Sequence, residues 1–447
     1  MDKTMRAGGT GTKGMKERGP LEERLVERPE LLERMHGIVD LLEGSVADGS
    51  DADEAEDRVV EDIRKLGQEV LGRWAREAAA AVDAQVPKAY PDAIRNGKKK
   101  VLRWQTTLGW MAVEEEQWRL GRRGKLLRPF LVRSGLAARG TSRRLQRVLA
   151  DFGAEESFAR AAERVREHHG VVVAVSRLRR QTLRHGAQLG AMEMARPRQT
   201  SAVLVTEMDG SLIPVVTPAG TGADRRKGKQ LHWREVRLCL ARDQGSATPC
   251  YGATLGSTGI AGDVWHRTAV AAGLGDPTRV HGVGDGADWI AAQFQEQFAA
   301  QGTYLVDFWH VGGYLAAAAA AIVPPARADA WRRRQQARLR KDGLAAVLRA
   351  LRPHIEPENQ VDAPVRAAHR YLSSRSTQLG YRQALDQDLP IGSGEIESAH
   401  RHVIQQRLKL AGSWWKEPNA QAMLGLRLAR ANHLGSSYWA DASLSKN

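Results

Sequence analysis

The sequence predicts an α/β fold: a mixed sheet that carries a helical insertion and is preceded by helical regions. Between 201 and 310, short apolar runs of strand length occur first in succession and then alternate with helical patterns, which is typical of a mixed sheet. From 311 to 388 the chain is rich in Ala and Arg and keeps helical spacing, so helices interrupt the sheet region. With 447 residues, the chain is long enough for two or three domains.

Residues 1–22 are rich in glycine and charge, and they predict disorder. From 21 to 84 apolar residues keep helical spacing, which predicts helices that could dimerise. The chain starts without an apolar segment of signal-peptide type, and its longest apolar run, at 314–323, is too short to span a bilayer. The chain has only Cys239 and Cys250, which cannot build a disulfide framework. We therefore expect an intracellular, cytoplasmic protein with no membrane partner.

A basic β-hairpin module is expected over 98–140. One strand is expected at 101–110, and a second starts at 114 and leads to a glycine-rich turn at 121–124. Such a hairpin can contact DNA phosphates, but a solvated sheet edge explains the lysines and arginines equally well.

Residues 141–197 predict a helix-turn-helix. One helix ends at His169-Gly170, and Ser176 is the expected N-cap of the next. The second helix carries side chains of the types that contact phosphates and guanine edges: Arg177, Arg180, Gln181 and Arg184. An ordinary helical hairpin with a charged face is the alternative.

The remaining chain divides into a sheet-containing core and its additions. Strands are expected at 202–210, 212–216, 233–241, 248–255, 279–286 and 303–306, with helices at 263–272 and 289–298. The resulting division is 1–97 (helical and disordered), 98–140 (hairpin), 141–197 (helix-turn-helix), 198–310 with 389–415 (core), 311–388 (insertion) and 416–447 (C-terminal helix and tail).

Three carboxylates are placed where such a core would collect them. Two expected strands end in Asp-Gly, at Asp209 and Asp285, and a helix that begins near 394 carries Glu397. Asp-Gly is also a common turn dipeptide, and an acid in a first turn can simply complement the helix dipole. Gathered together, however, three carboxylates would need cations between them, for which Mg²⁺ (or Mn²⁺) is suited. Two such ions, about 3.5–4 Å apart, support phosphodiester chemistry.

The charge balance points to the substrate. Lys and Arg number 67 against 52 Asp and Glu, which gives a net charge of +15. A chain this basic favours a polyanionic partner, and nucleic acid is the first candidate.

Four motifs together resemble one family. They are MDGS at 208–211, GDGADWI at 284–290, DFWH at 307–310 and GSGEIESAHRHVIQQRLKLAGSWW at 392–415. In this order they resemble the DDE transposases of bacterial insertion sequences of the ISKra type, relatives of the Mutator-like group, over roughly 150–435. The resemblance implies a ribonuclease H-like core with an all-helical insertion. It also matches Asp209, Asp285 and Glu397 with the three acids, and it leaves Glu395 on a variable position.

The resemblance also implies roles for residues around these acids. His310 falls on the family's Asp-x-x-His feature and would approach the DNA at the reacting phosphate, although a core histidine is the alternative. Further DNA contacts are expected from Arg401, Arg407, Lys409, Trp414 and Trp415, against the alternatives of a solvated helix face and buried tryptophans. Relatives often carry a cysteine-based zinc segment, but 118–124 contains no cysteine, so no zinc is expected there.

We therefore expect a bacterial, nucleoid-associated DDE transposase that binds its element's terminal inverted repeats in double-stranded DNA. It would use two Mg²⁺ ions to cleave the ends and transfer them to target DNA. Joining two ends requires at least a homodimer. The sequence indicates nothing about an RNA partner. Two other hypotheses remain: a non-catalytic DNA-binding regulator, and a metal-dependent nuclease that cuts without joining.

Overall fold

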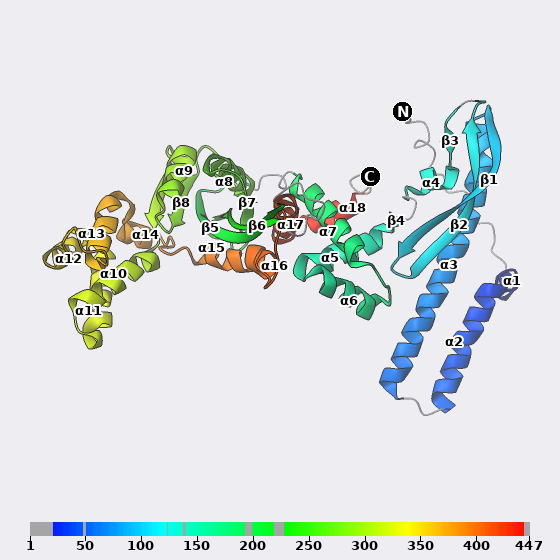
Figure 1. Cartoon of the computed structure of the whole chain (residues 1–447), viewed down its shortest axis with the longest axis horizontal. Coiled ribbons are helices and arrows are strands. Elements are labelled where there is room, and N and C mark those ends of the chain that lie inside the picture. The colour runs from blue at the N-terminus through cyan, green and yellow to red at the C-terminus, as the bar shows by residue number, and fades with distance from the viewer. Residues whose placement is uncertain are drawn as a thin grey trace. The chain divides into compact units, whose positions relative to one another are not determined.

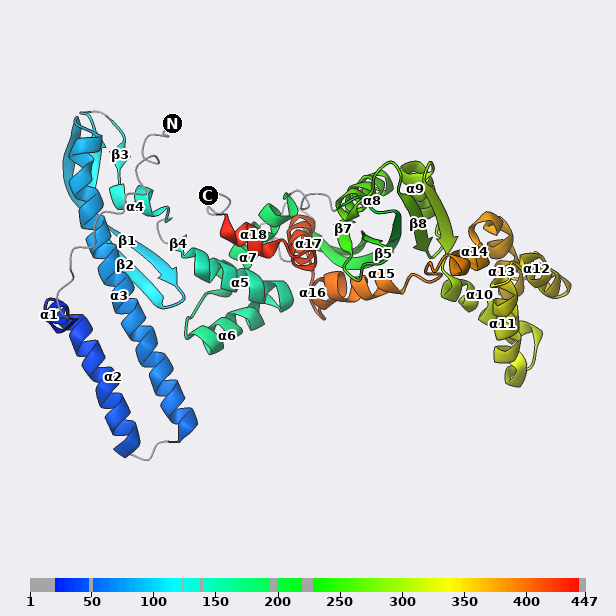
Figure 2. The same cartoon turned by 180° about the vertical axis from the view of Figure 1, so that it is seen from behind.

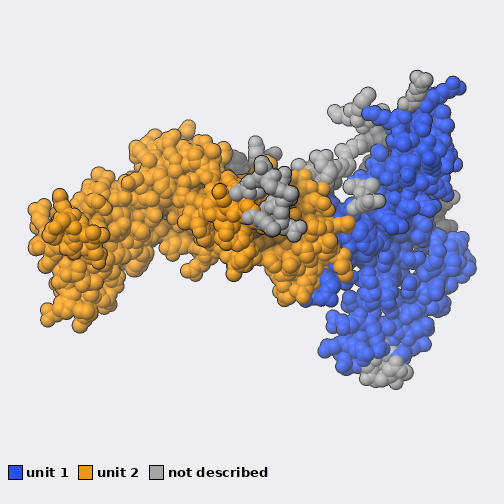
Figure 3. Space-filling model, viewed as in Figure 1, with its two compact units in different colours: residues 1–146, 166–171, 447 blue, residues 147–165, 172–446 orange. Residues whose placement is uncertain are grey.

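The computed structural model describes residues 21–47, 51–122, 124–136, 140–192, 199–218 and 228–441. The chain forms two compact units, one from 1–146 with 166–171 and the other from 147–165 with 172–446 (Figure 3). The disorder predicted for 1–22 lies almost wholly outside the described residues.

The first unit begins with α1 (Leu21–Val26), α2 (Pro29–Ala47) and the long helix α3 (Ala52–Ala89). The helix α3 starts where Asp51 accepts a hydrogen bond from the backbone N–H of Glu54. In Figure 1 the helices α2 and α3 lie side by side as a hairpin. The helical pattern predicted from 21 to 84 is therefore confirmed for the described residues.

A small sheet packs on α3. Its strands are β1 (Ala93–Thr106), β2 (Gly109–Leu120), β3 (Leu126–Leu127) and β4 (Gly140–Thr141), in the order β3-β2-β1-β4, with α4 (Pro129–Ser134) beside them. The predicted strand 101–110 was right only in part, because the hairpin turns at Thr107-Leu108, so its last two residues belong to β2. Thr106 Oγ1 accepts from Leu108 N–H and donates to the Gly109 carbonyl, and Gly109 has a φ of 114°. This local hydrogen bonding and a positive φ, which glycine tolerates, reverse the chain.

Three helices follow this sheet along the chain: α5 (Arg143–Glu155), α6 (Phe158–His169) and α7 (Val175–Gly190). The N-cap of α7 is Ala174, without a side-chain hydrogen bond, so the prediction that Ser176 caps this helix was wrong. The helix simply begins two residues earlier, directly after the β-branched segment.

The second unit contains a five-stranded mixed sheet. Its strands are β5 (Val203–Pro218), β6 (Lys229–Asp243), β7 (Cys250–Thr254), β8 (Arg279–Gly284) and β9 (Gly302–Val306), in the order β7-β6-β5-β8-β9. β6 is antiparallel to β5 and β7, whereas β8 and β9 are parallel to β5. The predicted mixed α/β sheet is confirmed at this level.

Helices cover both faces of this sheet, as Figures 1 and 2 show from opposite sides. On one face are α8 (Thr258–Ala272) and α9 (Asp288–Phe298), whose aromatic side chains pack on Leu204 and Met208 of β5. On the other face are α15 (Gly394–Ala399), the π-helix His400–Gln405, α16 (Gln406–Leu408) and α17 (Glu417–Ala431), followed by α18 (Gly435–Ala440).

The region between β9 and α15 is helical, as predicted. It contains α10 (Phe308–Ile322), α11 (Pro325–Leu339), α12 (Leu344–Leu351), α13 (Pro364–Ser374) and α14 (Tyr381–Asp386), with short 3-10 turns at Arg352–His354 and Ser376–Gln378. Its buried residues form one cluster with the ends of β5 and β9. Nowhere in the described chain is a helix both long and apolar enough to cross a membrane.

Candidate active site

Asp209 lies within β5 rather than at its end. The expected strands 202–210 and 212–216 form one strand, because β6 pairs with β5 continuously through Asp209 and Gly210. This cross-strand pairing outweighs the turn propensity of Asp-Gly. The parallel pairing between β5 and β8, however, stops at Glu207. Asp209 therefore follows the point where β5 loses its parallel neighbour, and it is partly exposed there.

Asp285 directly follows β8, at the carboxyl end of the neighbouring strand. Its Oδ1 accepts a 2.8 Å hydrogen bond from the N–H of Ala287, and its carbonyl accepts a 2.5 Å bond from the hydroxyl of Tyr371 in the insertion. The turn after β8 is thus held in place by an insertion helix, and Asp285 lines the adjoining pocket.

Glu397 lies in α15 with an exposed side chain, whereas Glu395 is engaged elsewhere. Glu395 forms a bidentate ion pair with Arg242 at the end of β6, with N–O distances of 2.5 to 3.0 Å. The two glutamates are two residues apart, and their side chains therefore diverge by about 200° around the helix axis. The structure thus places Glu397, and not Glu395, on the pocket.

The segment 307–310 begins α10 with an N-cap. Asp307 Oδ1 accepts from the N–H groups of Trp309 and His310, and Oδ2 accepts from the N–H and hydroxyl of Ser393. One buried carboxylate therefore ties the start of α10 to the residue that precedes α15. His310 itself is exposed, with its ring against Tyr314 and Tyr371, so it is not a core histidine.

One pocket of about 690 Å³ collects these groups. Its lining includes Asp209, Asp285, His310 and Glu397, which are all four of the predicted catalytic residues. They come from β5, the end of β8, α10 and α15, and they are separated by long stretches of sequence. Asp307 and Ser393 close the pocket at the junction of the two helices.

A second pocket of about 580 Å³ adjoins it and shares Asp285, His310 and Tyr314 with it. Its other side is formed by α13, where Arg370 is exposed and Arg375 lies over the ring of Tyr371. Arg375 is itself paired with the carboxylate of Asp288. The insertion therefore adds cationic and aromatic groups to the edge of the acidic pocket.

The three acids fit divalent metal ions in their chemistry. Their donors are carboxylate oxygens, which Mg²⁺ and Mn²⁺ prefer, and they share one open pocket. Among the described residues, however, no group of three or more His, Cys, Asp or Glu side chains is close enough to hold a metal ion. The two-ion site thus stays a prediction, and Asp209, Asp285 and Glu397 are not arranged as a finished ligand set.

His400 belongs to this region and was missed by the sequence analysis. It is buried at the start of the π-helix, and its Nε2 lies 3.3 Å from Asp209 Oδ2. Neither ring nitrogen has a hydrogen-bond partner among the described residues. The available signal was its spacing, because a residue three positions after Glu397 lies on the same side of a helix. Short π-helical segments are frequent at functional sites.

Glu207 is a second group that was missed. It is buried beneath α15, and its Oε2 accepts a 2.8 Å hydrogen bond from the N–H of Ile396. Burial raises the pKa of Glu207 to about 8. The sequence indicates this position only through strand alternation. Because residues two apart on a strand point to the same face of the sheet, Glu207 lies on the same face as Asp209.

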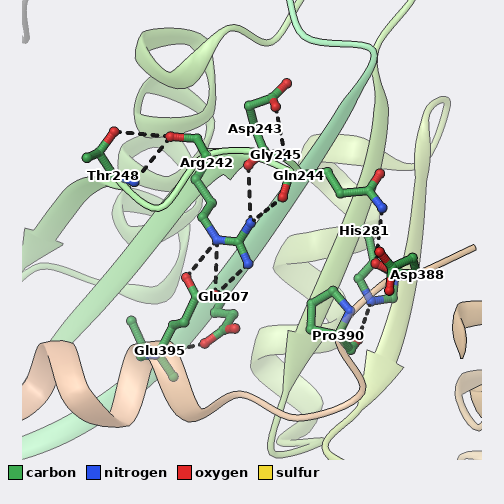
Figure 4. A network of polar contacts seen from close by, with 12 residues as sticks. Glu207, Arg242, Asp243, Gln244, Gly245, Thr248, His281, Asp388, Pro390 and Glu395 are labelled. Atoms are coloured by element: carbon green, nitrogen blue, oxygen red, sulfur yellow. Dashed lines mark hydrogen bonds and ion pairs between the residues drawn. The ribbon is translucent and has the colours of Figure 1, made fainter.

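Arg242 organises a polar network behind the pocket, which Figure 4 shows. Besides Glu395, it contacts the carbonyls of Asp243 and Gln244, at 3.1 and 2.9 Å. The hydrogen bond with Glu395 raises the pKa of Arg242 above its ordinary value, although burial opposes this. Gln244 in turn donates to the carbonyl of Asp388. The chain that returns from the insertion is thereby attached to the end of β6.

The predicted DNA-contacting residues of α7 differ in exposure. Arg180 is exposed, and Arg177 and Gln181 are partly exposed. Arg184 is also only partly exposed: it contacts the ring of His185, and burial lowers its pKa. The opposite face of α7 packs closely on α17, where a Cβ on Gly186 would lie 2.2 Å from the carbonyl oxygen of Ala422. The structure therefore shows α7 as an integral part of the second unit.

Two of the expected DNA contacts near the C-terminus were wrong. The side chain of Arg407 is only 1% exposed, donates to the carbonyl of Gly153, and lies between the rings of Phe158 and Trp415. Burial lowers the pKa of Arg407 to about 10. Trp415 is 5% exposed and donates to the carbonyl of Leu408. Both residues serve the core: Arg407 packs against the end of α5 and the start of α6, and Trp415 lies beyond α16 in a bridge with β5.

The other three residues expected to contact DNA there, Arg401, Lys409 and Trp414, are exposed and so remain available for contacts with a ligand.

Comparison with known proteins adds little to this geometry. No family model and no curated protein matches the sequence. Among solved structures, the chain is similar to the Drosophila P element transposase in its strand transfer complex, with 9% identity and a TM-score of 0.24 over 66% of this chain and 80% of that one. A likeness with so low a TM-score supports neither a shared fold nor a shared activity.

Proposed function

We propose that this protein is a DDE transposase that cleaves the ends of its own DNA element and joins them to target DNA. The observation that carries the proposal is the single pocket that collects Asp209, Asp285, Glu397 and His310 from four separate elements. The strand order, in which β6 alone runs antiparallel to the other four strands, is compatible with a ribonuclease H-like core.

The residues of the pocket have distinct tasks in this proposal. Asp209, Asp285 and Glu397 would hold Mg²⁺ or Mn²⁺, two ions in the full site. When bound, such ions lower the pKa of a water and stabilise the charge on the leaving oxygen. The carboxylate of Asp285 is already oriented by the N–H of Ala287. His310 is exposed beside these acids and can donate a hydrogen bond to a phosphate oxygen of the substrate.

The surrounding charge suits a DNA strand. The net charge of +15 favours binding of the backbone, and Arg370 is exposed at the pocket that adjoins the acids. Arg177, Arg180, Arg401 and Lys409 would add phosphate contacts, which position DNA without selecting its sequence. Joining two DNA ends would require at least a dimer of this chain.

The test is cleavage of a labelled duplex that carries the end of the element, in Mg²⁺ and in Mn²⁺. Glu397→Gln is expected to reduce cleavage by about 10³-fold or more while leaving DNA binding intact, because it removes one metal-holding carboxylate. Glu395→Gln, two residues away in the same helix, is the matched comparison: it removes no metal-holding carboxylate, so its loss of cleavage should be about tenfold at most. If the wild type binds the duplex and never cuts it in either metal, the protein is a DNA-binding regulator.

A strand-transfer assay separates the transposase from a nuclease. A duplex with a free 3′-hydroxyl at the element end is mixed with plasmid DNA, and joined products are counted. Joined products that disappear in Glu397→Gln support the proposal. Cleavage without any joining would favour a metal-dependent nuclease instead.

A further inference from the structure

The start of α15 is held at three successive points. The N–H of Ser393 donates to Asp307, the carboxylate of Glu395 pairs with Arg242, and the N–H of Ile396 donates to Glu207. Two of these contacts hold the backbone. The third, between Glu395 and Arg242, acts through a side chain of α15 itself, and it restrains rotation of the helix about its axis.

Arg242 is well placed to restrain the helix, because its guanidinium is bonded both to Glu395 and to the backbone where β6 ends. Its side chain is 13% exposed, against 39% for Glu395, so the pair is sheltered rather than fully solvated. The guanidinium also donates to the carbonyls of Asp243 and Gln244, where β6 ends. Figure 4 shows these bonds converging on the one guanidinium. Arg242 thus connects α15 to the sheet by a fork with fixed geometry.

We propose that Arg242 is a positioning residue for the third carboxylate: through Glu395 it fixes the rotation of α15 and thereby directs Glu397 into the pocket. The proposal rests on the proposed function and assigns a task to a residue outside the acid triad. It also explains why a second glutamate stands two residues before Glu397. That glutamate serves the helix and not the chemistry.

A double-mutant cycle tests the path of this effect. Arg242→Gln and Glu395→Ala should each lower kcat about tenfold, since small displacements of a reacting group reduce rates steeply, and KM should stay within about twofold. Because both changes break the same contact, the double variant should be no slower than the slower single one. Arg242→Lys keeps the charge without the fork and should lie between Arg242→Gln and the wild type.

The control is an ion pair of the same type on the same strand. Arg234 of β6 pairs with Glu417 in the first turn of α17, at 3.3 Å, and both side chains are roughly half exposed. Arg234→Gln should leave kcat unchanged. Melting temperatures of all variants show whether a loss of kcat merely follows a loss of folded protein.

Hydrogen exchange supplies a measurement that does not need activity. In the peptide that covers 394–399, Arg242→Gln and Glu395→Ala should each speed amide exchange about tenfold, because the helix opens more often. Arg234→Gln should leave this peptide as in the wild type. If the wild type fails to cut DNA, the proposed function fails, and the exchange rates still decide whether Arg242 fixes α15. Three results would each overturn the inference. The first is amide exchange in the two single variants that equals that of the wild type, and the second is additive losses of kcat in the double variant. The third is a wild type that cuts DNA while the single variants keep its kcat.

Discussion

Replacing Asp307 with asparagine should destabilise the second unit strongly, because this buried carboxylate accepts four hydrogen bonds. Asparagine offers one oxygen, so the N–H of Ser393 would lose its acceptor. A buried donor left without a partner costs about 1–3 kcal/mol, and weakening each other bond from charged to neutral costs about 0.5–1 kcal/mol. The expected loss in the free energy of unfolding is therefore about 2.5–6 kcal/mol.

The assay is urea denaturation followed by circular dichroism, with Asp288→Asn as the control. Asp288 is 97% exposed and pairs with Arg375 on the surface, so its replacement should cost about 0–1 kcal/mol. Since Asp307 also joins the starts of α10 and α15, Asp307→Asn should abolish cleavage even where the protein remains folded. A loss of stability for Asp307→Asn no larger than that for Asp288→Asn would refute the reasoning.

Three further predictions concern packing, burial and pH. Gly186→Ala should lower the free energy of unfolding by about 1–3 kcal/mol, because the new methyl group would overpack against α17. Gly259 in α8 has open space around it, so Gly259→Ala should raise the free energy of unfolding by about 0.5–1 kcal/mol. Equal effects of the two substitutions in urea denaturation would contradict the close packing of α7 on α17. Arg407→Met should leave the salt dependence of DNA binding unchanged, while Arg401→Met should reduce it if the exposed residue contacts phosphate. Burial lowers the pKa of His281, so its contribution to stability is present above its ordinary pKa of 6.5 and is lost as the pH falls below it; His281→Gln should flatten the pH dependence of unfolding there.

The co-location of the acids could be predicted because it depends on topology. Asp285 follows a strand and Glu397 begins a helix, and such positions meet at one edge of an α/β sheet. The position of Asp209 was predicted for a partly wrong reason, since β5 does not end there. It lies at the pocket because β8, the parallel neighbour of β5, ends earlier. The sequence showed where the acids gather but could not show which strand stops first.

The wrong DNA contacts have a common physical cause. A helix rich in Arg and Lys suggests a solvated face, but the pattern does not say which cation lies on which side. Arg407 is enclosed by Phe158 and Trp415, which stabilise its guanidinium by cation–π contacts. Such burial depends on aromatic residues that are distant in sequence or follow the helix. Local spacing therefore could not separate Arg407 from the exposed Lys409.

The sequence of α7 contains an indication of its close packing that the interpretation as a DNA-binding helix did not use. Gly186 and Gly190 lie four residues apart in a helix, where glycine is unfavourable unless another backbone approaches. A Cβ on Gly190 would lie 3.1 Å from the Cα of Gly425 in α17. The glycines thus indicated a helix–helix contact, while the arginines on the other face indicated a ligand. One helix can pack on α17 with its glycine face and contact a ligand with its arginine face.

The buried groups beneath α15 help to decide between an enzyme and a regulator. Burial raises the pKa of Glu207 to about 8, and its Oε1 has no hydrogen-bond partner among the described residues. A carboxyl group in that state destabilises the fold near neutral pH, and a protein that only binds DNA gains nothing from placing it under Glu397. Strongly perturbed groups beside a pocket are more typical of active sites, where strain is retained for the geometry it provides. The buried carboxyl group of Glu207 beneath α15 therefore supports the proposal of catalysis at this pocket over DNA binding alone.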